Sequence, residues 1–358
     1  MGLSDSVAGR AASPSPRVAQ SATARRPEWP DSTEERDQFV LSRRPPRRVP
    51  DPWRHQGVFA EDERAADGSL VRAATVFLTG RECPWRCLMC DLWTLTVEED
   101  TPAGALVQQL RDARGELGPR LPEHVKLYNA GSFFDPRAVP EADYAAIAEN
   151  LRGFRHVIVE SHPRLIGRRL GRWQDALRSA AGTGESASLE VAIGLETAHP
   201  MALERLHKRF TLDDFRRAAD RLRDAGAALR VFLLVGVPFL SRAEQLEWLR
   251  QSVAFAFDCG ASVVSLIPTR PGNGALDAMG SSGLFDSPSL DDLERALDAA
   301  LPAARGRVFA DLWDVERFAS CPACLDARRD RMRRMNLTQR LEPRLRCVKC
   351  CDPRRAEL

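Results

Sequence analysis

Hydrophobic and polar positions follow two patterns from about residue 70 onward: short apolar runs typical of buried strands, and longer stretches with the spacing of an amphipathic helix. The predicted strands cover residues 73–79, 124–129, 155–160, 188–194, 229–235, 262–267 and, as a short last strand, 307–312. The predicted helices lie near residues 103–116, 138–152, 172–181, 211–226, 241–258 and 288–304. Strands joined by helical crossovers imply an α/β fold with a parallel sheet, and the right-handed crossover rule allows an open sheet or a barrel-like winding.

The two ends of the chain lack this alternation. Residues 1–50 are rich in Ser, Pro, Arg and Ala and show no apolar periodicity, which predicts a mostly disordered leader. We therefore expect three parts: the leader over 1–50, an α/β core over 51–312, and a small cysteine-rich element over 313–358.

Composition and charge narrow the class of protein. Hydrophobic residues make up 44% of the chain and charged residues 28%, as in soluble globular proteins. No apolar run approaches the roughly 18 residues of a membrane helix and no secretory signal is evident, so we expect a cytoplasmic protein without a membrane partner. The net charge is only +2, but residues 321–358 hold 11 Lys or Arg against 5 Asp or Glu, and 11 − 5 = +6. The tail is therefore basic.

Three of the nine cysteines form a tight group directly after the first predicted strand. Cys83, Cys87 and Cys90 have the spacing C-x3-C-x2-C. Three thiolates on one short loop can bind three irons of a 4Fe-4S cluster and leave the fourth iron open for a small molecule. Zinc fits less well, because a structural zinc ion takes four ligands, usually in C-x2-C pairs.

At these residues the chain resembles the radical S-adenosylmethionine (SAM) superfamily, whose signature is C-x3-C-x2-C. The resemblance covers about residues 70–312. It implies a partial (β/α)6 barrel of the TIM type and a 4Fe-4S cluster whose open iron is chelated by SAM. It also implies an electron from a low-potential donor of the flavodoxin or ferredoxin type, and a 5′-deoxyadenosyl radical that takes a hydrogen atom from the substrate.

The resemblance also implies SAM contacts at the carboxyl ends of the strands, where barrel enzymes place their sites. Met89 occupies a position that is usually aromatic in the superfamily, and the segment Asn129–Ser132 stands in place of a Gly-Gly-Glu type loop but lacks its Glu. The SAM contacts carried over in this way are Met89, Gly131, Ser132, Glu160, Ser161, Glu196, Thr197 and Gly236. No residue is assigned a catalytic role.

A second group of cysteines lies in the basic tail. Cys321, Cys324, Cys347 and Cys350 form a C-x2-C pair followed by another, and Cys351 is left over as a free thiol or an alternative ligand. The spacing fits a zinc ribbon or an auxiliary iron-sulfur cluster, and we favour zinc. Because arginines such as Arg328, Arg329, Arg333 and Arg334 lie between the pairs, this element is a candidate clamp for RNA phosphates.

Within the superfamily the core resembles the elongator-catalytic-subunit and coproporphyrinogen-oxidase branch, through the Gly-x-Pro segment 236–238. The segments 130–136, 194–197 and 238–241 most resemble archaeosine-synthase radical SAM proteins, which act on a modified base in tRNA. Two alternatives stay open. One is radical SAM maturation of a small molecule or peptide with an auxiliary iron-sulfur cluster, and the other is a non-enzymatic iron-sulfur or zinc protein that binds nucleic acid.

Overall fold

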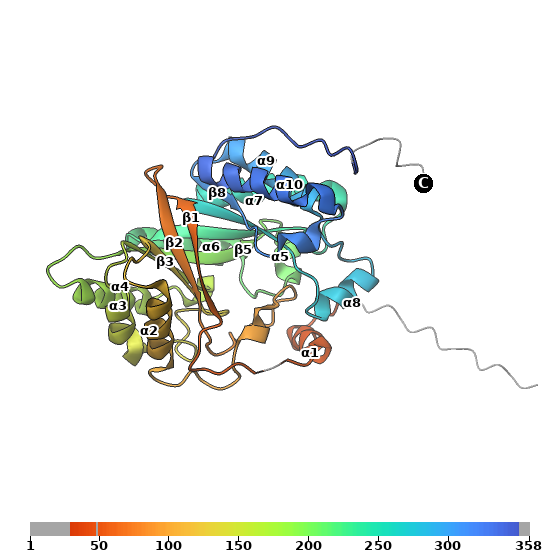
Figure 1. Ribbon diagram of the computed structural model, residues 1–358. Helices are drawn as coiled ribbons and strands as arrows, with labels where there is room; N and C mark the ends of the chain where they lie inside the picture. Colours follow the sequence, from red (N-terminus) through yellow and green to blue (C-terminus); the bar gives the residue numbers. More distant parts are fainter. Residues whose placement is uncertain (1–28, 48, 351–358) are drawn as a thin grey trace, which may run out of the picture.

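One sheet of eight strands organises the chain in a computed structural model that describes residues 29–47 and 49–350 (Figure 1). The strands lie side by side in the order in which they occur in the sequence, and only β1 is antiparallel to its neighbour. Their bounds are β1 Gly57–Arg64, β2 Leu70–Phe77, β3 His124–Tyr128, β4 His156–Glu160, β5 Ser188–Glu196, β6 Ala228–Val235, β7 Ala261–Pro268 and β8 Arg307–Ala310. Sequential order with parallel pairing is the topology of a barrel, and the sheet curls as a half-barrel, which confirms the predicted fold class.

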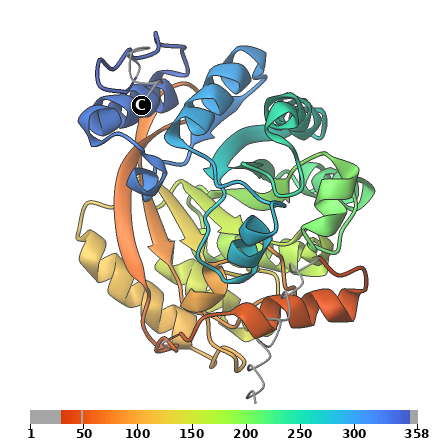
Figure 2. The ribbon, with the colours of Figure 1, turned by 90° about the vertical axis from the view of Figure 1, so that its right-hand side faces the viewer.

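Most of the helices cover the convex face of the sheet, whereas α1 and α8 lie at one end of the half-barrel beside the cysteine loop (Figure 2). Their bounds are α1 Thr33–Arg43, α2 Ala105–Leu117, α3 Tyr144–Asn150, α4 Arg168–Ala181, α5 Pro200–Arg205, α6 Leu212–Asp224, α7 Arg242–Asp258, α8 Ala275–Ser281, α9 Leu290–Ala300 and α10 Pro322–Thr338. Among the described residues, none of these helices has both the length and the apolar character needed to cross a bilayer.

The prediction misses one strand. All seven predicted strands are present, but the sequence pattern does not identify β1, which forms a hairpin with β2 at the edge of the sheet. The second half of β1 reads Glu61-Asp62-Glu63-Arg64. An edge strand with one solvated face needs no apolar run, so hydrophobicity alone does not reveal it.

Charged side chains fill the concave side of the sheet toward the amino ends of the strands. Residues that alternate with the helix-facing core positions meet there: Lys126 Nζ lies 2.5 Å from Glu63 Oε2, and Arg230 binds Glu63 at 2.6 Å and Glu190 at 2.5 Å. Although burial opposes it, the positive charge of Arg230 holds the pKa of Glu190 at about 2. Paired and hydrogen-bonded charges of this kind tolerate burial. This network fills the interior below the carboxyl ends of the strands.

The predicted disorder of the leader does not extend to residue 50. Residues 1–28 lie outside the described part of the chain, but α1 is a regular helix that buries Phe39 and Val40 together with Trp29. These side chains pack against Leu88 in the cysteine loop and Met279 of α8. The helix has a narrow apolar face whose partners lie far away in the sequence, so local composition predicts disorder where tertiary packing gives order.

Removing the Phe39 side chain is expected to destabilise the protein. Phe39 is 6% exposed, and Phe39→Ala is expected to lower the free energy of unfolding by about 3 kcal/mol, because deletion of a buried aromatic ring loses its transfer free energy and leaves a cavity. Leu41→Ala, at a residue on the same helix that is 45% exposed, is the control and should change stability by less than about 0.5 kcal/mol. Chemical denaturation measures both, and equal effects would contradict the packing of α1.

The tail is continuous with the barrel rather than a separate small domain beginning at residue 313. Helix α10 buries Met332 and Met335 in the main hydrophobic core. Arg331 is 1% exposed and binds Asp298 at 2.6 Å and the Glu342 carbonyl at 2.6 Å. An arginine-rich helix can pack in this way because its few apolar residues point inward while its buried charge meets acidic partners.

Candidate functional site

A cavity of about 220 Å³ opens at the carboxyl ends of the strands. Nine of the residues singled out from the sequence line it, together with Trp85, Asp91, Lys208, Thr269 and Arg270, which were not predicted. The nine are Cys83, Cys87, Met89, Cys90, Gly131, Ser132, Glu160, Ser161 and Glu196. The topology brings these distant residues together because parallel strands all end on the same side of the sheet.

The cysteine loop is held from three sides. The Leu88 amide donates to the Leu206 carbonyl at 3.0 Å, and Asn273 Nδ2 donates to the carbonyls of Leu88 and Cys90 at 2.7 and 3.2 Å. The ring of Trp85 stacks on His162 with 3.5 Å between centroids and 11° between planes. The loop is therefore fixed against α5, the β7–α8 connection and the end of β4 before any ligand binds.

The three thiols of this loop lie in a nonpolar environment. Burial raises the pKa of Cys87 to about 12 and also raises the pKa of Cys83 and Cys90. Thiolates at such a place need a positive partner, which a metal cluster supplies. Cys259, a buried thiol away from the cavity, belongs to the hydrophobic core.

Lys208 is a component of the site that the sequence analysis missed. Its Nζ donates to Glu196 Oε1 at 2.6 Å, and both side chains line the cavity. Burial opposes its charge, but the Glu196 carboxylate and the Cys87 thiol raise the pKa of Lys208 overall. The one signal in the sequence that could have identified Lys208 is its residue type, because it is one of three lysines in a chain that otherwise uses arginine.

A glycine makes room for this ion pair. A Cβ atom added to Gly194 would lie 2.2 Å from Glu196 Oε1 and 2.6 Å from Lys208 Nζ. The sheet register shifts between Gly194 and Glu196, and Glu196 has the left-handed φ of 68°. The local backbone at the end of β5 therefore turns the Glu196 side chain back into the cavity.

Glu160 offers a hydrogen-bond acceptor without a partner. Its Oε1 is buried and makes no hydrogen bond within the described part of the chain. Burial raises the pKa of Glu160 to about 7, against the backbone N–H groups of Asn129, Ala130 and Gly131, which lower it. Nearby, Ser132 Oγ accepts from the His162 amide at 2.9 Å and so ties the β3 loop to the β4 loop.

Two predicted SAM contacts lie outside the cavity lining. Thr197 Oγ1 accepts from the His199 amide at 3.1 Å in the turn before α5. Gly236 has a φ of 80°, and an added Cβ would lie 2.8 Å from Pro288. The chain bends away directly after Glu196 and after Val235, so these residues serve turns rather than the cavity wall.

The residues around the cavity fit a 4Fe-4S cluster and SAM. Three thiols come from one fixed loop, and a buried carboxylate oxygen without a partner can accept an amino group. A buried polar atom of this kind has a free-energy cost unless a ligand satisfies it. Cys83, Cys87 and Cys90 would hold the cluster, and Glu160 is placed to receive a donor from the ligand.

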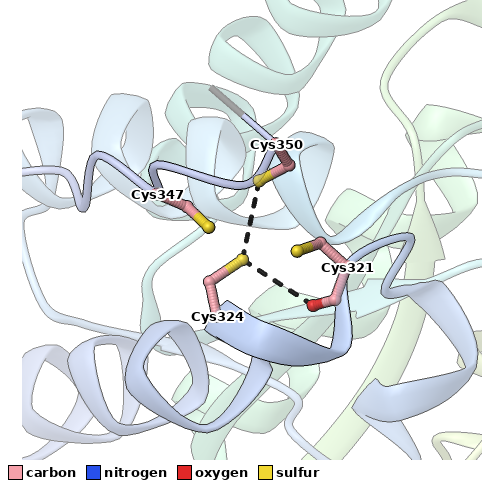
Figure 3. Close-up of side chains that lie close together, drawn as sticks. All are labelled: Cys321, Cys324, Cys347 and Cys350. Atoms are coloured by element: carbon pink, nitrogen blue, oxygen red, sulfur yellow. Dashed lines mark hydrogen bonds between the residues drawn. The ribbon is translucent and has the colours of Figure 1, made fainter. Parts of the chain in front are cut away.

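The second cysteine group converges in space (Figure 3). Cys321 caps the amino end of α10, Cys324 lies in its first turn, and Cys347 and Cys350 arrive from the segment that follows the helix. The four sulfur atoms all lie within 4.8 Å of one another, and those of Cys324 and Cys350 are 3.7 Å apart. Cys351 lies outside the described residues.

The arginines near this cysteine group are largely paired with acids. Arg328 binds Glu294 at 2.7 Å, Arg329 binds Asp326 at 2.7 Å and Arg334 binds Glu342 at 2.7 Å. The predicted clamp for RNA phosphates therefore has fewer free charges than the sequence suggests, because neighbouring acids on α9, on α10 and after it neutralise them.

The half-barrel, the cysteine loop and the cavity beside it agree with the resemblance to the radical SAM superfamily that the sequence shows. Among solved structures, the Elp3 protein of Methanocaldococcus infernus matches 68% of this chain and 60% of its own chain, with 14% identity and a TM-score of 0.48. No protein-family model matches the chain.

Two curated proteins are similar to the chain in sequence. The chain is 25% identical over 249 residues to archaeosine synthase subunit beta of Methanosarcina acetivorans, which covers 66% of this chain and 70% of the relative. It is 28% identical over 172 residues to archaeosine synthase subunit beta of Thermococcus kodakarensis, covering 47% of this chain and 51% of that relative. The chain thus spans about half the length of the second relative.

Proposed function

We propose that this protein cleaves SAM reductively at a 4Fe-4S cluster held by Cys83, Cys87 and Cys90, and acts on a modified base in tRNA. The observation that carries the proposal is the placement of a C-x3-C-x2-C loop at the mouth of a parallel half-barrel, beside the unpartnered oxygen of Glu160. When bound, the cluster and SAM supply a 5′-deoxyadenosyl radical.

The residues of the chain have distinct tasks in this proposal. Glu160 accepts a hydrogen bond from the SAM amino group with the oxygen that has no other partner. Lys208, fixed by Glu196, places a positive charge close to the buried thiols, where it would favour their thiolate forms. Trp85, stacked on His162, and Leu88, packed against α1, keep the loop rigid and exclude water from one side of it.

The tRNA substrate is supported by the two archaeosine synthase relatives. An electron donor of low potential, such as a flavodoxin or ferredoxin, is a further requirement of the proposed chemistry. The alternative with an auxiliary cluster in the tail is less well supported, because thiolates that bind four different irons lie further apart than those that share one ion.

We propose zinc for the tail site. Tetrahedral zinc with Zn–S distances of about 2.3 Å requires sulfur atoms about 3.8 Å apart. The 3.7 Å between Cys324 and Cys350 agrees with this distance. Four cysteines leave no open position, so the role of this zinc is to fasten the segment after α10 to the amino end of that helix.

Anaerobic reconstitution tests the proposed activity. The protein is loaded with iron and sulfide, given SAM and dithionite, and assayed for 5′-deoxyadenosine by chromatography. The proposal requires its formation with reductant and none without it. A protein that binds four irons and yields no 5′-deoxyadenosine would be a carrier or a nucleic-acid binder.

SAM binding is expected to depend on pH through Glu160. Burial raises the pKa of Glu160 to about 7, so the carboxylate that receives the amino group is present above that pH and is lost below it. We expect SAM affinity to fall by about tenfold from about pH 8 to about pH 6. Equilibrium dialysis without reductant measures it. Part of any pH dependence of SAM affinity comes from the titration of SAM itself, and Glu160→Gln should remove the rest. If the Glu160→Gln protein keeps the wild-type pH profile, Glu160 is not the group responsible.

A further inference from the structure

A second hollow, larger than the cavity at the strand ends, lies next to it. This outer hollow has a volume of about 650 Å³ and is lined by residues of α1, α5 and the start of α6, together with the segments before α4 and after α5. Arg164, Arg209 and Phe210 line the outer hollow, and none of them lines the cavity. The proposed binding of the cluster and SAM does not use these residues.

One short segment separates the outer hollow from the cavity. His207 and Arg209 line the outer hollow, whereas Lys208 between them lines the cavity and binds Glu196. Both His207 and Arg209 have the left-handed φ of 60°. Backbone of this kind costs free energy and is concentrated at functional sites. In this segment it accompanies a wall that presents side chains to the two spaces in turn.

Aromatic rings connect the outer hollow with the cysteine loop. Phe210 lies on the wall of the hollow, and its ring centroid is 5.4 Å from that of His162. His162 stacks on Trp85 at 3.5 Å, and Trp85 lies between Cys83 and Cys87 in the chain. Another side of the loop is covered by α1 and α8, and the cavity itself must admit SAM. The row of rings is therefore a route from the surface to the loop that does not cross the SAM site.

Two exposed arginines at the outer hollow are not neutralised by the protein. Arg164 forms no ion pair among the residues that the structure describes, and its Nη1 donates to the Arg209 carbonyl at 3.1 Å. Arg209 lies 3.8 Å from Asp37 Oδ2, while Asp37 Oδ1 is closer to His207 Nε2, at 2.8 Å. The two guanidinium groups thus offer positive charge to a partner.

Exposed acids at the same hollow argue against a nucleic-acid backbone as that partner. Glu204, whose side chain is 62% exposed, binds Arg36, and Asp213, whose side chain is 73% exposed, binds Arg216 at 2.8 Å. A continuous row of phosphates would be repelled by these carboxylates. The surface of a protein carries separate charges of both signs and can match such a pattern.

We propose that the outer hollow is the docking surface of a small acidic one-electron carrier protein. The inference deepens the proposed function and rests on it, because reductive cleavage of SAM takes one electron from a donor outside this chain. That electron leaves the reduced carrier and is taken up at the cluster, and no bond changes in the docking surface. Electron-transfer complexes have small interfaces, and complementary charges steer their formation. Arg164 and Arg209 are placed to meet carboxylates of the carrier.

Titration calorimetry with two carriers tests the inference. Flavodoxin and a ferredoxin with two 4Fe-4S clusters, both oxidised, are added anaerobically to the reconstituted protein at low salt. We expect the wild-type protein to bind at least one of them, and to bind it more weakly as the salt concentration rises. Arg164→Glu/Arg209→Glu should weaken this binding by about tenfold or more, because it turns attraction into repulsion. Arg164→Lys/Arg209→Lys, which keeps the charges, should bind within about threefold of wild type.

Arg155 provides the matched control. It is exposed and directly precedes β4, whereas Arg164 follows the same strand at the opposite end of the barrel. Among the described residues Arg155 forms no ion pair either, so Arg155→Glu reverses a similar charge away from the outer hollow and should bind the carrier as the wild type does. The same series should order the rate at which the reduced carrier, below saturation, reduces the cluster, followed by the visible absorption of the cluster.

Three results would overturn the assignment. They are wild-type protein that binds neither carrier, an Arg164→Glu/Arg209→Glu protein that binds within about twofold of wild type, and an equal loss of binding in Arg155→Glu. Loss of tRNA binding in the double charge reversal, with carrier binding unchanged, would assign the hollow to RNA instead.

Dithionite separates this inference from the proposed activity, because a small reductant needs no docking surface. If the wild-type protein forms 5′-deoxyadenosine with dithionite but no carrier docks at the outer hollow, the proposed activity stands and the electron enters elsewhere. If carrier binding depends on Arg164 and Arg209 but dithionite yields no 5′-deoxyadenosine, the docking surface stands without that activity.

Discussion

The Cys87→Ala protein is expected to lose both its 4Fe-4S cluster and its 5′-deoxyadenosine formation. Cys87 is the middle ligand of the loop, and two thiolates cannot hold a cluster that has one iron already open. Because even residues that only support metal ligands change activity by 10- to 100-fold, loss of a ligand should lower SAM cleavage by more than about a hundredfold. Iron and sulfide analysis, the visible absorption of the cluster and the 5′-deoxyadenosine assay measure the effect.

A matched cysteine separates loss of the ligand from loss of the fold. Cys259 is 8% exposed and Cys87 is 9% exposed, but Cys259 lies in the hydrophobic core away from the cavity. Cys259→Ala should keep about four irons per chain and near wild-type SAM cleavage. A Cys87→Ala protein that still cleaves SAM reductively would refute the assignment of the cluster.

The second large effect is expected at the tail. On a background in which Cys83, Cys87 and Cys90 are all alanine, the protein should retain about one zinc per chain, and Cys324→Ser should reduce this to nearly none. Cys324 is the most buried of the four ligands, 5% exposed, and holds the amino end of α10. Metal analysis after desalting gives the stoichiometry, and limited proteolysis after residue 338 reports release of the segment that follows α10.

The neighbouring cysteine provides the control for this experiment. Cys351→Ser should leave the zinc content unchanged, because four sulfur ligands already lie within 4.8 Å of one another. About four irons with sulfide on the triple-alanine background would show a second cluster instead. If neither zinc nor iron is found, the four cysteines do not bind a metal.

The sequence alone predicts the repeating part of the fold and the first cysteine group. Seven strands and the main helices follow from periodicity, because each strand buries both faces and each helix buries one. Cys83, Cys87 and Cys90 are recognisable because a short loop fixes their spacing regardless of the surroundings. Glu160 and Glu196 were carried over from the family resemblance, and they meet at the cavity because parallel strands end on the same side of the sheet.

The sequence could not predict features that depend on distant partners. Helix α1 is ordered by Leu88 and Met279, and Arg328 of α10 is paired with Glu294 of α9. Neither effect leaves a local signal, because composition describes neighbours in the chain and not neighbours in space.

The sequence by itself thus determined the class of fold and the two groups in which the cysteines lie. Only the tertiary structure decided which polar groups stand without partners around the cavity. Lys208 comes from the loop after α5 and Arg270 from the segment after β7, and each reaches the cavity through a different turn. Strand formation depends on periodic burial along the chain, whereas the makeup of a site depends on how the turns after separate strands converge, which no local pattern records.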